Sequence, residues 1–269
     1  MAPIEIVRVD GRRSEIVADC AAVEEPLEVR LHGRPFAVIM RTPGADRELA
    51  AGFLFAERIL EHADGLGTIE HCTDDKGGRA DNVVNVTLTD ASRLDALLDE
   101  RRQVTTNSSC GLCGRRTIES LSVDVEPLEA PWTVAASTLG LLVDRLRGTQ
   151  RVFDETGGLH GAALFRPDGS LIEAAEDVGR HNAVDKVIGR LLMREALPAS
   201  ETLLFVSGRA SFEIVQKALM AGVPMVASVS APSTLAVDLA AAMGVTLAGF
   251  VRGERFNIYA HPERIRQDA

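Results

Sequence analysis

The second half of the chain alternates between stretches with helical spacing of apolar residues and short apolar runs. The predicted helices cover residues 133–148, 181–196, 211–222 and 233–244. The predicted strands cover residues 202–208, 224–230, 245–253 and 255–260, and residues 161–177 form a hairpin. Helices that alternate with apolar strands favour a sheet with helices on both faces. We therefore expect an α/β fold with a mixed, largely parallel sheet flanked by helices and the hairpin at one edge.

The first part of the chain is organised differently. The pattern predicts a hairpin over residues 26–42, a helix over 44–63, a strand over 82–89 and a short helix over 92–102. Pro127 and Pro131 then mark a junction. We expect a smaller N-terminal α+β domain over residues 1–125 and a larger domain over residues 126–269.

Charge and hydropathy limit the partners of the chain. Its formal net charge is −10, whereas nucleic-acid and membrane-surface binders are normally basic, so we expect neither partner. No run reaches the roughly 18 apolar residues of a membrane span, and the N-terminus lacks a signal-peptide pattern. We expect a cytoplasmic protein with reduced cysteines. Cys20 and Cys72 stand alone and are expected as small core residues.

Residues 105–116, TTNSSCGLCGRR, hold the other two cysteines, Cys110 and Cys113. A structural zinc site needs four ligands, and only His71 and Cys72 could complete the set. Because these two are neighbours in a predicted strand, their side chains point to opposite faces, which argues against zinc. A redox dithiol is expected after an apolar strand, whereas the residues before Cys110 are polar. A loop without any role is a further alternative.

The residues around the pair favour a sulfur carrier over these alternatives. Gly111 and Gly114 allow the loop to move, and Arg115 and Arg116 provide positive charge that favours a thiolate. An exposed thiolate can accept a sulfur atom as a persulfide, and a second cysteine can resolve that persulfide by forming a disulfide.

Three predicted strand-to-helix turns, EDVGRHN, SGRAS and SAPST, are rich in small and hydroxyl residues. Exposed N–H groups at helix starts attract phosphate, and ligands of open α/β sheets bind at the carboxyl ends of strands. The candidate residues for an anionic, nucleotide-like ligand are His160, Arg180, His181, Ser207 and Arg209. The alternative is that the serines and glycines only cap helices and that His160 is a core or capping residue.

The order of elements in the larger domain is that of the zinc-dependent cytidine deaminases, which allows a test. These enzymes carry H-x-E at the start of the second helix and P-C-x-x-C at the start of the third. Here the second helix has His181 but Ala183 in place of the glutamate, and the third, GRASFEIV, has no cysteine. We therefore expect a deaminase-like domain without zinc, which could keep the shape of the pocket but not the reaction.

Several motifs occur together in one order along nearly the whole chain, beginning at EEPLEVRLHG. They are SSCGLCG, TGGLHGAAL, EDVGRHNAVDKVIG, SGRASFEIVQKALMAGVP, SVSAPSTLAVDLA and GFVRGERFNIYAHPERI. In this set and order the chain resembles the formate dehydrogenase accessory sulfurtransferases, the FdhD family.

The resemblance implies a sulfurtransferase. Members accept sulfur from a cysteine desulfurase as a cysteine persulfide and pass it to the molybdenum or tungsten of the bis-molybdopterin guanine dinucleotide cofactor, which formate dehydrogenase requires. The persulfide-bearing residue corresponds to Cys110, and its partner to Cys113. The cofactor-binding segment corresponds to six residues: Phe250, Val251, Arg252, Gly253, Glu254 and Arg255. The resemblance also implies a homodimer with a zinc-free, deaminase-like C-terminal domain.

Two questions stay open at this level. Arg252 and Arg255 could pair with the diphosphate of the guanine dinucleotide, or they could simply solvate the end of a strand. The chain could also be a non-catalytic chaperone that binds the cofactor and its client formate dehydrogenase, or a nucleotide-processing enzyme of the deaminase fold.

Overall fold

The computed structural model describes residues 1–73, 78–92, 94–95 and 125–268. Its larger sheet has six strands in the order β13-β12-β11-β10-β8-β9. Their bounds are β8 (His160–Phe165), β9 (Leu171–Asp177), β10 (Leu203–Val206), β11 (Met225–Ser228), β12 (Thr246–Arg252) and β13 (Arg255–Ala260). The predicted α/β fold is confirmed, and each strand expected in this part of the chain is present.

The sheet is mixed, as predicted, but less parallel than we expected. Among these six strands, β10, β11 and β12 pair in parallel, whereas β8 with β9, β8 with β10, and β12 with β13 pair antiparallel. The reason is that both edges of the sheet are hairpins, whose short turns leave no room for the crossover that a parallel pair requires.

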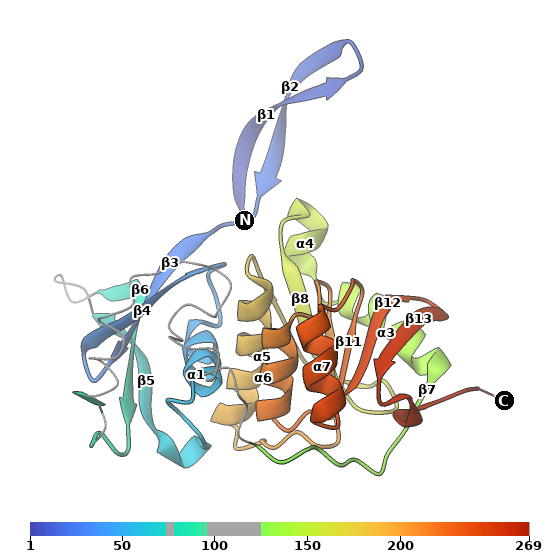
Figure 1. The fold of residues 1–269 in the computed structure, drawn as a ribbon. Helices are drawn as coiled ribbons and strands as arrows, with labels where there is room; N and C mark the ends of the chain where they lie inside the picture. Colours follow the sequence, from blue (N-terminus) through green and yellow to red (C-terminus); the bar gives the residue numbers. More distant parts are fainter. Residues whose placement is uncertain (74–77, 93, 96–124, 269) are drawn as a thin grey trace.

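Helices cover both faces of this sheet (Figure 1). On one face lie α5 (Arg180–Met193), α6 (Phe212–Met220) and α7 (Thr234–Ala242), and on the other lies α3 (Ala136–Arg147). Alternate residues of β10 supply the two cores: Leu204 and Val206 pack on the α5–α7 side, and Leu203 and Phe205 on the α3 side. This period of two is expected of a strand buried on both faces.

Three short elements were not predicted. They are the helix α4 (Arg151–Thr156) and the strands β7 (Val134–Ala135) and β14 (Ile265–Arg266), which pair in parallel. None of the helices in the described ranges combines the length and hydropathy that a membrane crossing requires.

In the described residues, the smaller unit contains a four-stranded sheet, in the order β4-β3-β6-β5, and the helix α1. Its elements are β3 (Glu25–Leu31), β4 (Arg34–Arg41), α1 (Asp46–Ala56), β5 (Leu66–Thr73) and β6 (Arg79–Leu88). The predicted hairpin, helix and strand are confirmed here. The helix predicted over residues 92–102 lies largely outside the described residues, and the domain boundary at residue 125 stays a prediction.

The two units meet through α1 and α5, whose backbones nearly touch. A Cβ atom on Gly52 would lie 2.0 Å from the carbonyl oxygen of Asp185, and one on Gly189 would lie 1.9 Å from that of Glu48. Both distances are far below van der Waals contact, so only glycine fits at these positions. Apolar residues of both units accordingly form one continuous core cluster.

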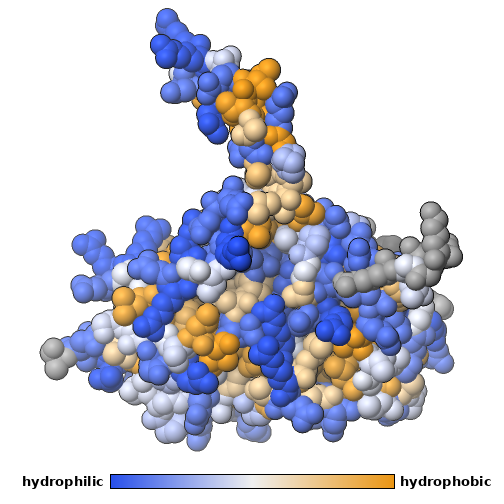
Figure 2. All heavy atoms as spheres, turned by 180° about the vertical axis from the view of Figure 1, so that it is seen from behind, coloured by the Kyte–Doolittle hydropathy of each residue, from blue (hydrophilic) through white to orange (hydrophobic). Residues whose placement is uncertain are grey.

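An N-terminal hairpin, which the sequence analysis did not predict, stands away from both units (Figures 1 and 2). It consists of β1 (Ala2–Asp10) and β2 (Arg13–Ala21). Val7 pairs with Ile16, and on this face Val7, Val9 and Ile16 are 64%, 68% and 68% exposed. On the opposite face Arg8 pairs with Glu15. A lone two-stranded hairpin is marginally stable in water, so its apolar face predicts a covering partner.

Candidate functional site

The carboxyl ends of β10, β11 and β12 come together with the starts of α6 and α7 at one edge of the larger sheet. Ala210, after β10, forms a bridge with Pro232, after β11, and also accepts a hydrogen bond from the backbone N–H of Ser233 (3.1 Å). The backbone N–H of Phe250, in β12, donates to the carbonyl of Ser230 (3.1 Å). These contacts hold the three turns side by side, and we call the surface that they form the strand-end site.

The predicted residues His160, Arg180 and Ser207 lie together at this site. The backbone N–H of Gly161, next to His160, donates to Ser207 Oγ (2.9 Å). A Cβ atom on Gly208 would lie 3.3 Å from His160 Nδ1 and 3.5 Å from Arg180 Cδ, so both side chains contact this glycine. Burial, together with the charge of Arg180, holds the pKa of His160 below its ordinary value.

Two arginines give the strand-end site positive charge at helix starts. Arg180 is the first residue of α5, and its Nε is buried with no hydrogen-bond partner in the described structure. Arg209 is exposed and lies three positions before the first residue of α6. Ser233 caps α7 by accepting a hydrogen bond from the backbone N–H of Ala236 (3.3 Å). Unpaired donors and helix N-termini of this kind suit a phosphate group.

The predicted segment 250–255 is divided between two places. Phe250 is 40% exposed and is tied to the strand-end site through its backbone. The side chain of Val251 is fully buried in the core on the α3 side, so it cannot reach a ligand. The remaining four residues are exposed around the turn between β12 and β13. This turn packs closely on α3, because a Cβ atom on Gly140 of α3 would lie 2.5 Å from the carbonyl oxygen of Gly253.

A buried charge cluster lies directly behind the strand-end site, between α5 and α6. His181 Nε2 is 3.3 Å from Ser211 Oγ, and His181 Nδ1 is 3.2 Å from Glu213 Oε2. Lys217 Nζ is 2.6 Å from Asp185 Oδ1 and 3.5 Å from Glu213 Oε1. We call Asp185, Lys217, Glu213 and His181 the unbalanced cluster, because it has two carboxylates and a single permanent cation.

Burial dominates the electrostatics of the unbalanced cluster. It raises the pKa of Asp185 to about 6 and the pKa of Glu213 to about 7, although the charge of Lys217 works in the opposite direction. Burial also acts to lower the pKa of Lys217, but the charges of Asp185 and Glu213 outweigh it, so the pKa is raised. The cluster therefore keeps its lysine charged and favours a proton on a carboxylate.

A second buried cluster joins the two units on the other side of α5. Arg41 holds Asp46 through two hydrogen bonds of 3.0 Å, and Lys186 Nζ is 2.7 Å from Asp177 Oδ2. Thr42 links the pairs, since its N–H donates to Asp177 (3.1 Å) and its carbonyl accepts from Lys186 (2.8 Å). We call Arg41, Asp46, Asp177 and Lys186 the balanced cluster, because it has two cations and two carboxylates.

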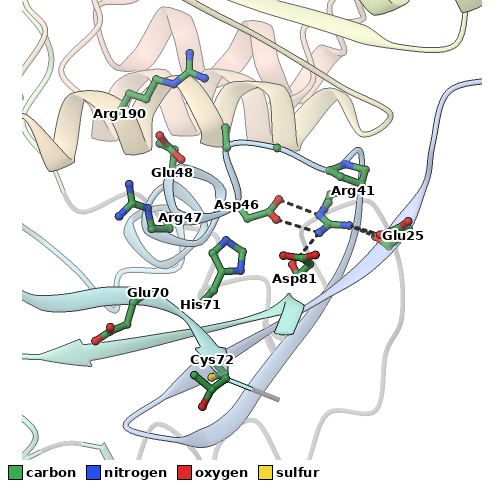
Figure 3. A pocket seen from close by; sticks show the side chains of 14 residues that line it. Glu25, Arg41, Asp46, Arg47, Glu48, Glu70, His71, Cys72, Asp81 and Arg190 are labelled. Atoms are coloured by element: carbon green, nitrogen blue, oxygen red, sulfur yellow. Dashed lines mark hydrogen bonds and ion pairs between the residues drawn. The ribbon is translucent and has the colours of Figure 1, made fainter. Parts of the chain in front are cut away.

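A cleft of about 990 Å³ opens beside Arg41 and Asp46 of the balanced cluster (Figure 3). Side chains of both charges line it, including Glu48, Glu70 and Arg47, and Arg41 is held there by Asp46 and Glu25. The sequence analysis did not anticipate this cleft. Most of its positive charge is already paired, and the helix start that lines it, that of α1, carries the acidic residues Asp46 and Glu48, so it is the weaker candidate for an anionic ligand.

The four cysteines divide into two groups. Cys110 and Cys113 lie outside the described residues, so their predicted roles stay predictions. Cys20 in β2 and Cys72 in β5 are free thiols and are half-buried, so the expectation that they belong to the core was wrong. Cys20 lies in the two-stranded hairpin, and Cys72 lies in the edge strand of the four-stranded sheet, so neither is enclosed between packed layers. Across the described ranges, no three His, Cys, Asp or Glu side chains gather in a way that could hold a metal ion.

The chain is similar to several known proteins. A model of the FdhD/NarQ family matches residues 22–266. "Sulfur carrier protein FdhD" of Streptomyces avermitilis is 49% identical in an alignment that covers 97% of this chain and 94% of the relative. The protein of that name from Anaeromyxobacter dehalogenans is 51% identical, with 94% and 91% covered. The crystal structure of a putative formate dehydrogenase accessory protein from Desulfotalea psychrophila superposes with a TM-score of 0.78 at 26% identity, covering 98% of this chain and 99% of that one.

Proposed function

Because the chain belongs to the FdhD/NarQ family, we propose that it carries sulfur to a formate dehydrogenase as a persulfide on Cys110. The observation that supports this most strongly is identity of about half the residues to proteins named sulfur carriers, over more than nine-tenths of the chain. The cysteine pair and its neighbouring arginines independently favour the same chemistry.

The loading step is a thiol exchange. The Cys110 thiolate attacks the outer sulfur of a persulfide on a cysteine desulfurase, the sulfur–sulfur bond of the donor breaks, and the donor cysteine leaves as a thiolate. The outer sulfur is then bound to Cys110. Cys113 can attack that persulfide in turn, which forms a Cys110–Cys113 disulfide and releases sulfide, so an intact Cys113 limits how long the persulfide survives.

The acceptor that we propose is the bis-molybdopterin guanine dinucleotide cofactor, with molybdenum or tungsten, as a bound substrate of the strand-end site. Arg180 offers an unpaired buried donor, Arg209 is exposed beside it, and three helices begin around them. These groups match the diphosphate of a guanine dinucleotide. Phe250 places an exposed aromatic ring at the same edge, where it could stack against the purine.

Intact-protein mass spectrometry after incubation with a cysteine desulfurase and cysteine tests the carrier role. We expect a gain of one sulfur atom that maps to Cys110 and is absent from the Cys110→Ala variant. Cys113→Ala should retain the sulfur for longer. If Cys110→Ala fully restores formate dehydrogenase activity to cells that lack this protein, the chain acts instead as a non-catalytic chaperone of the cofactor and its client.

We also propose that two copies of the chain associate through the apolar faces of their N-terminal hairpins. Stacking the faces that carry Val7, Val9 and Ile16 would cover apolar side chains that are otherwise mostly exposed. Val7→Lys should shift the protein to monomers in light scattering, whereas Arg8→Ala, on the opposite face, should not. A monomeric wild-type protein at all concentrations would contradict the assignment.

A further inference from the structure

We infer that Glu213 and His181 share one proton behind the strand-end site and that this pair orients the Ser211 hydroxyl toward the bound ligand. The inference deepens the proposed function, because the ligand is the guanine nucleotide part of the cofactor proposed above. His181 and Glu213 are positioning residues in this arrangement, and Ser211 is the group that the ligand would meet.

The charges of the unbalanced cluster require one more proton than a neutral imidazole supplies. Asp185, Lys217, Glu213 and His181 are 2%, 4%, 6% and 5% exposed. With a neutral imidazole and two ionised carboxylates, the cluster would carry one uncompensated negative charge, which costs several kcal/mol in a buried site. One additional proton removes that charge. Asp185 is already in direct contact with Lys217, so the proton belongs on the other side of the cluster.

The hydrogen bonding of Glu213 is incomplete. Its Oε1 is within ion-pair distance of Lys217, but its Oε2 is buried and receives no hydrogen bond of good geometry in the described structure. His181 Nδ1 lies 3.2 Å from this Oε2 atom. A buried carboxylate oxygen without a donor is unfavourable, whereas a proton between these two atoms satisfies both of them.

Ser211 lies between this buried pair and the strand-end site. This residue is the N-cap of α6, it is partly exposed, and its side chain makes no capping hydrogen bond. Its Oγ instead lies 3.3 Å from His181 Nε2. Because the shared proton lies between Glu213 Oε2 and His181 Nδ1, the imidazole's own proton is on Nε2. Nε2–H therefore donates to Ser211 Oγ, and the serine hydroxyl is left to donate toward the ligand. A serine so fixed at a helix start can bond a phosphate oxygen.

The charged groups around the pair come from every neighbouring element. Arg180 begins α5, His160 begins β8, Asp177 ends β9, and Glu57, partly buried at the end of α1, adds negative charge to the cluster. Asp177 is neutralised by Lys186. An anionic ligand at the strand-end site therefore raises the negative potential at the pair, and we expect its binding to strengthen the hold on the shared proton.

Two measurements test the inference. The chain has six histidines, so ring ¹⁵N spectra can follow each of them with pH, with His181→Gln as the assignment control. We expect His181 to stay protonated to a higher pH than the exposed His62, and Glu213→Gln to lower its titration by at least about one pH unit. If His181 in the wild-type protein titrates as His62 does, the inference is wrong, whether or not the variant folds.

The second measurement uses GDP as the probe. Calorimetry at one pH in two buffers of different ionisation enthalpy gives the number of protons taken up on binding. We expect net uptake with the wild type, none with Glu213→Gln, and about tenfold weaker binding with Ser211→Ala. If GDP does not bind, the proposed nucleotide site is wrong, and the ¹⁵N titration still tests whether His181 and Glu213 share a proton. If GDP binds without proton uptake and Ser211→Ala binds normally, the role of the pair in orienting Ser211 is refuted.

Discussion

Two consecutive residues of α5, Asp185 and Lys186, belong to buried charge clusters of different composition. Lys186 belongs to the balanced cluster, where each cation has its own carboxylate and the neighbouring backbone supplies further hydrogen bonds. Asp185 belongs to the unbalanced cluster, where two carboxylates share Lys217. One helix thus separates a cluster with complete pairing from a cluster with an unmet charge.

The difference between the clusters shows that buried charges can serve structure when they are fully paired and function when they are not. The balanced cluster lies where the smaller unit meets α5 and β9, and it joins β4 to both. Its charges cancel, so it contributes a fixed connection. The unbalanced cluster lies behind the strand-end site, and it can satisfy its charge only by holding a proton. A group that gains or loses a proton near neutral pH is suited to respond to a ligand.

The largest effect is expected from breaking the balanced cluster. Asp177→Ala leaves Lys186 buried without its carboxylate and removes the acceptor of the Thr42 N–H, so we expect the free energy of unfolding to fall by about 3–5 kcal/mol. Urea denaturation followed by circular dichroism measures this loss. The double variant Asp177→Ala with Lys186→Met is the control and should recover part of it. A loss below about 1 kcal/mol would show that the pair is not desolvated.

A somewhat smaller effect is expected from removing the cation of the unbalanced cluster. Lys217→Met leaves Asp185 and Glu213 facing each other, so we expect a loss of about 3 kcal/mol at pH 8. At pH 5 the loss should be clearly smaller, because both carboxyls, with raised pKa values of about 6 and about 7, can then be neutral. Denaturation at the two pH values measures both losses, and the double variant Asp185→Asn with Lys217→Met is the control. An equal loss at both would contradict the raised pKa values.

The sequence revealed the fold more fully than it revealed these clusters. Periodicity is local, so the strands and helices from residue 133 to residue 260 could be found from spacing alone, except for the short elements β7 and α4. Burial of charge is not local. Asp185, Lys186, Glu213 and Lys217 have the composition of a solvated helix face, and only the close approach of α1 at Gly52 and Gly189 places α5 between two layers. Two glycines in the middle of predicted helices were the available signal.

The candidate site divides in the same way. His160, Arg180, His181, Ser207 and Arg209 were predicted because they follow strands or begin helices. The structure places His160, Arg180, Ser207 and Arg209 at one edge of the sheet and His181 in the buried cluster behind them, and their binding role stays a prediction. Ser211 and Glu213 were missed, because nothing in their spacing shows that His181, thirty residues away, lies against them. Val251 was included because it lies within a motif, and motif membership does not indicate which way a strand residue points.

In the unmodified protein, the raised pKa of Glu213 should make stability depend on pH. The pKa of Glu213 is about 7 in the folded chain and ordinarily 4.5, so the folded state keeps a proton that the unfolded state has released. Stability is then greatest below about pH 4.5 as far as this group is concerned, and it is lost as pH rises through 7. We expect a loss of roughly 2 kcal/mol between pH 5 and pH 8, and a flatter profile for Glu213→Gln. A wild-type profile that rises over this interval would rule out the retained proton.

The smallest effect is expected from an ion pair that belongs to neither cluster. Arg147 Nη2 is 2.8 Å from Asp154 Oδ1, which is as short as the contacts in the buried clusters, but the two side chains are 48% and 53% exposed. Arg147 also packs over the ring of Phe153, 4.0 Å from its centroid, and keeps this contact in Asp154→Ala. We expect that variant to lose no more than about 0.5 kcal/mol, with little dependence on pH between 5 and 8. Because the distance matches that of Lys186 and Asp177, the comparison isolates burial as the variable. A loss approaching that of Asp177→Ala would mean that contact distance, and not removal from water, decides what a charge contributes to this fold.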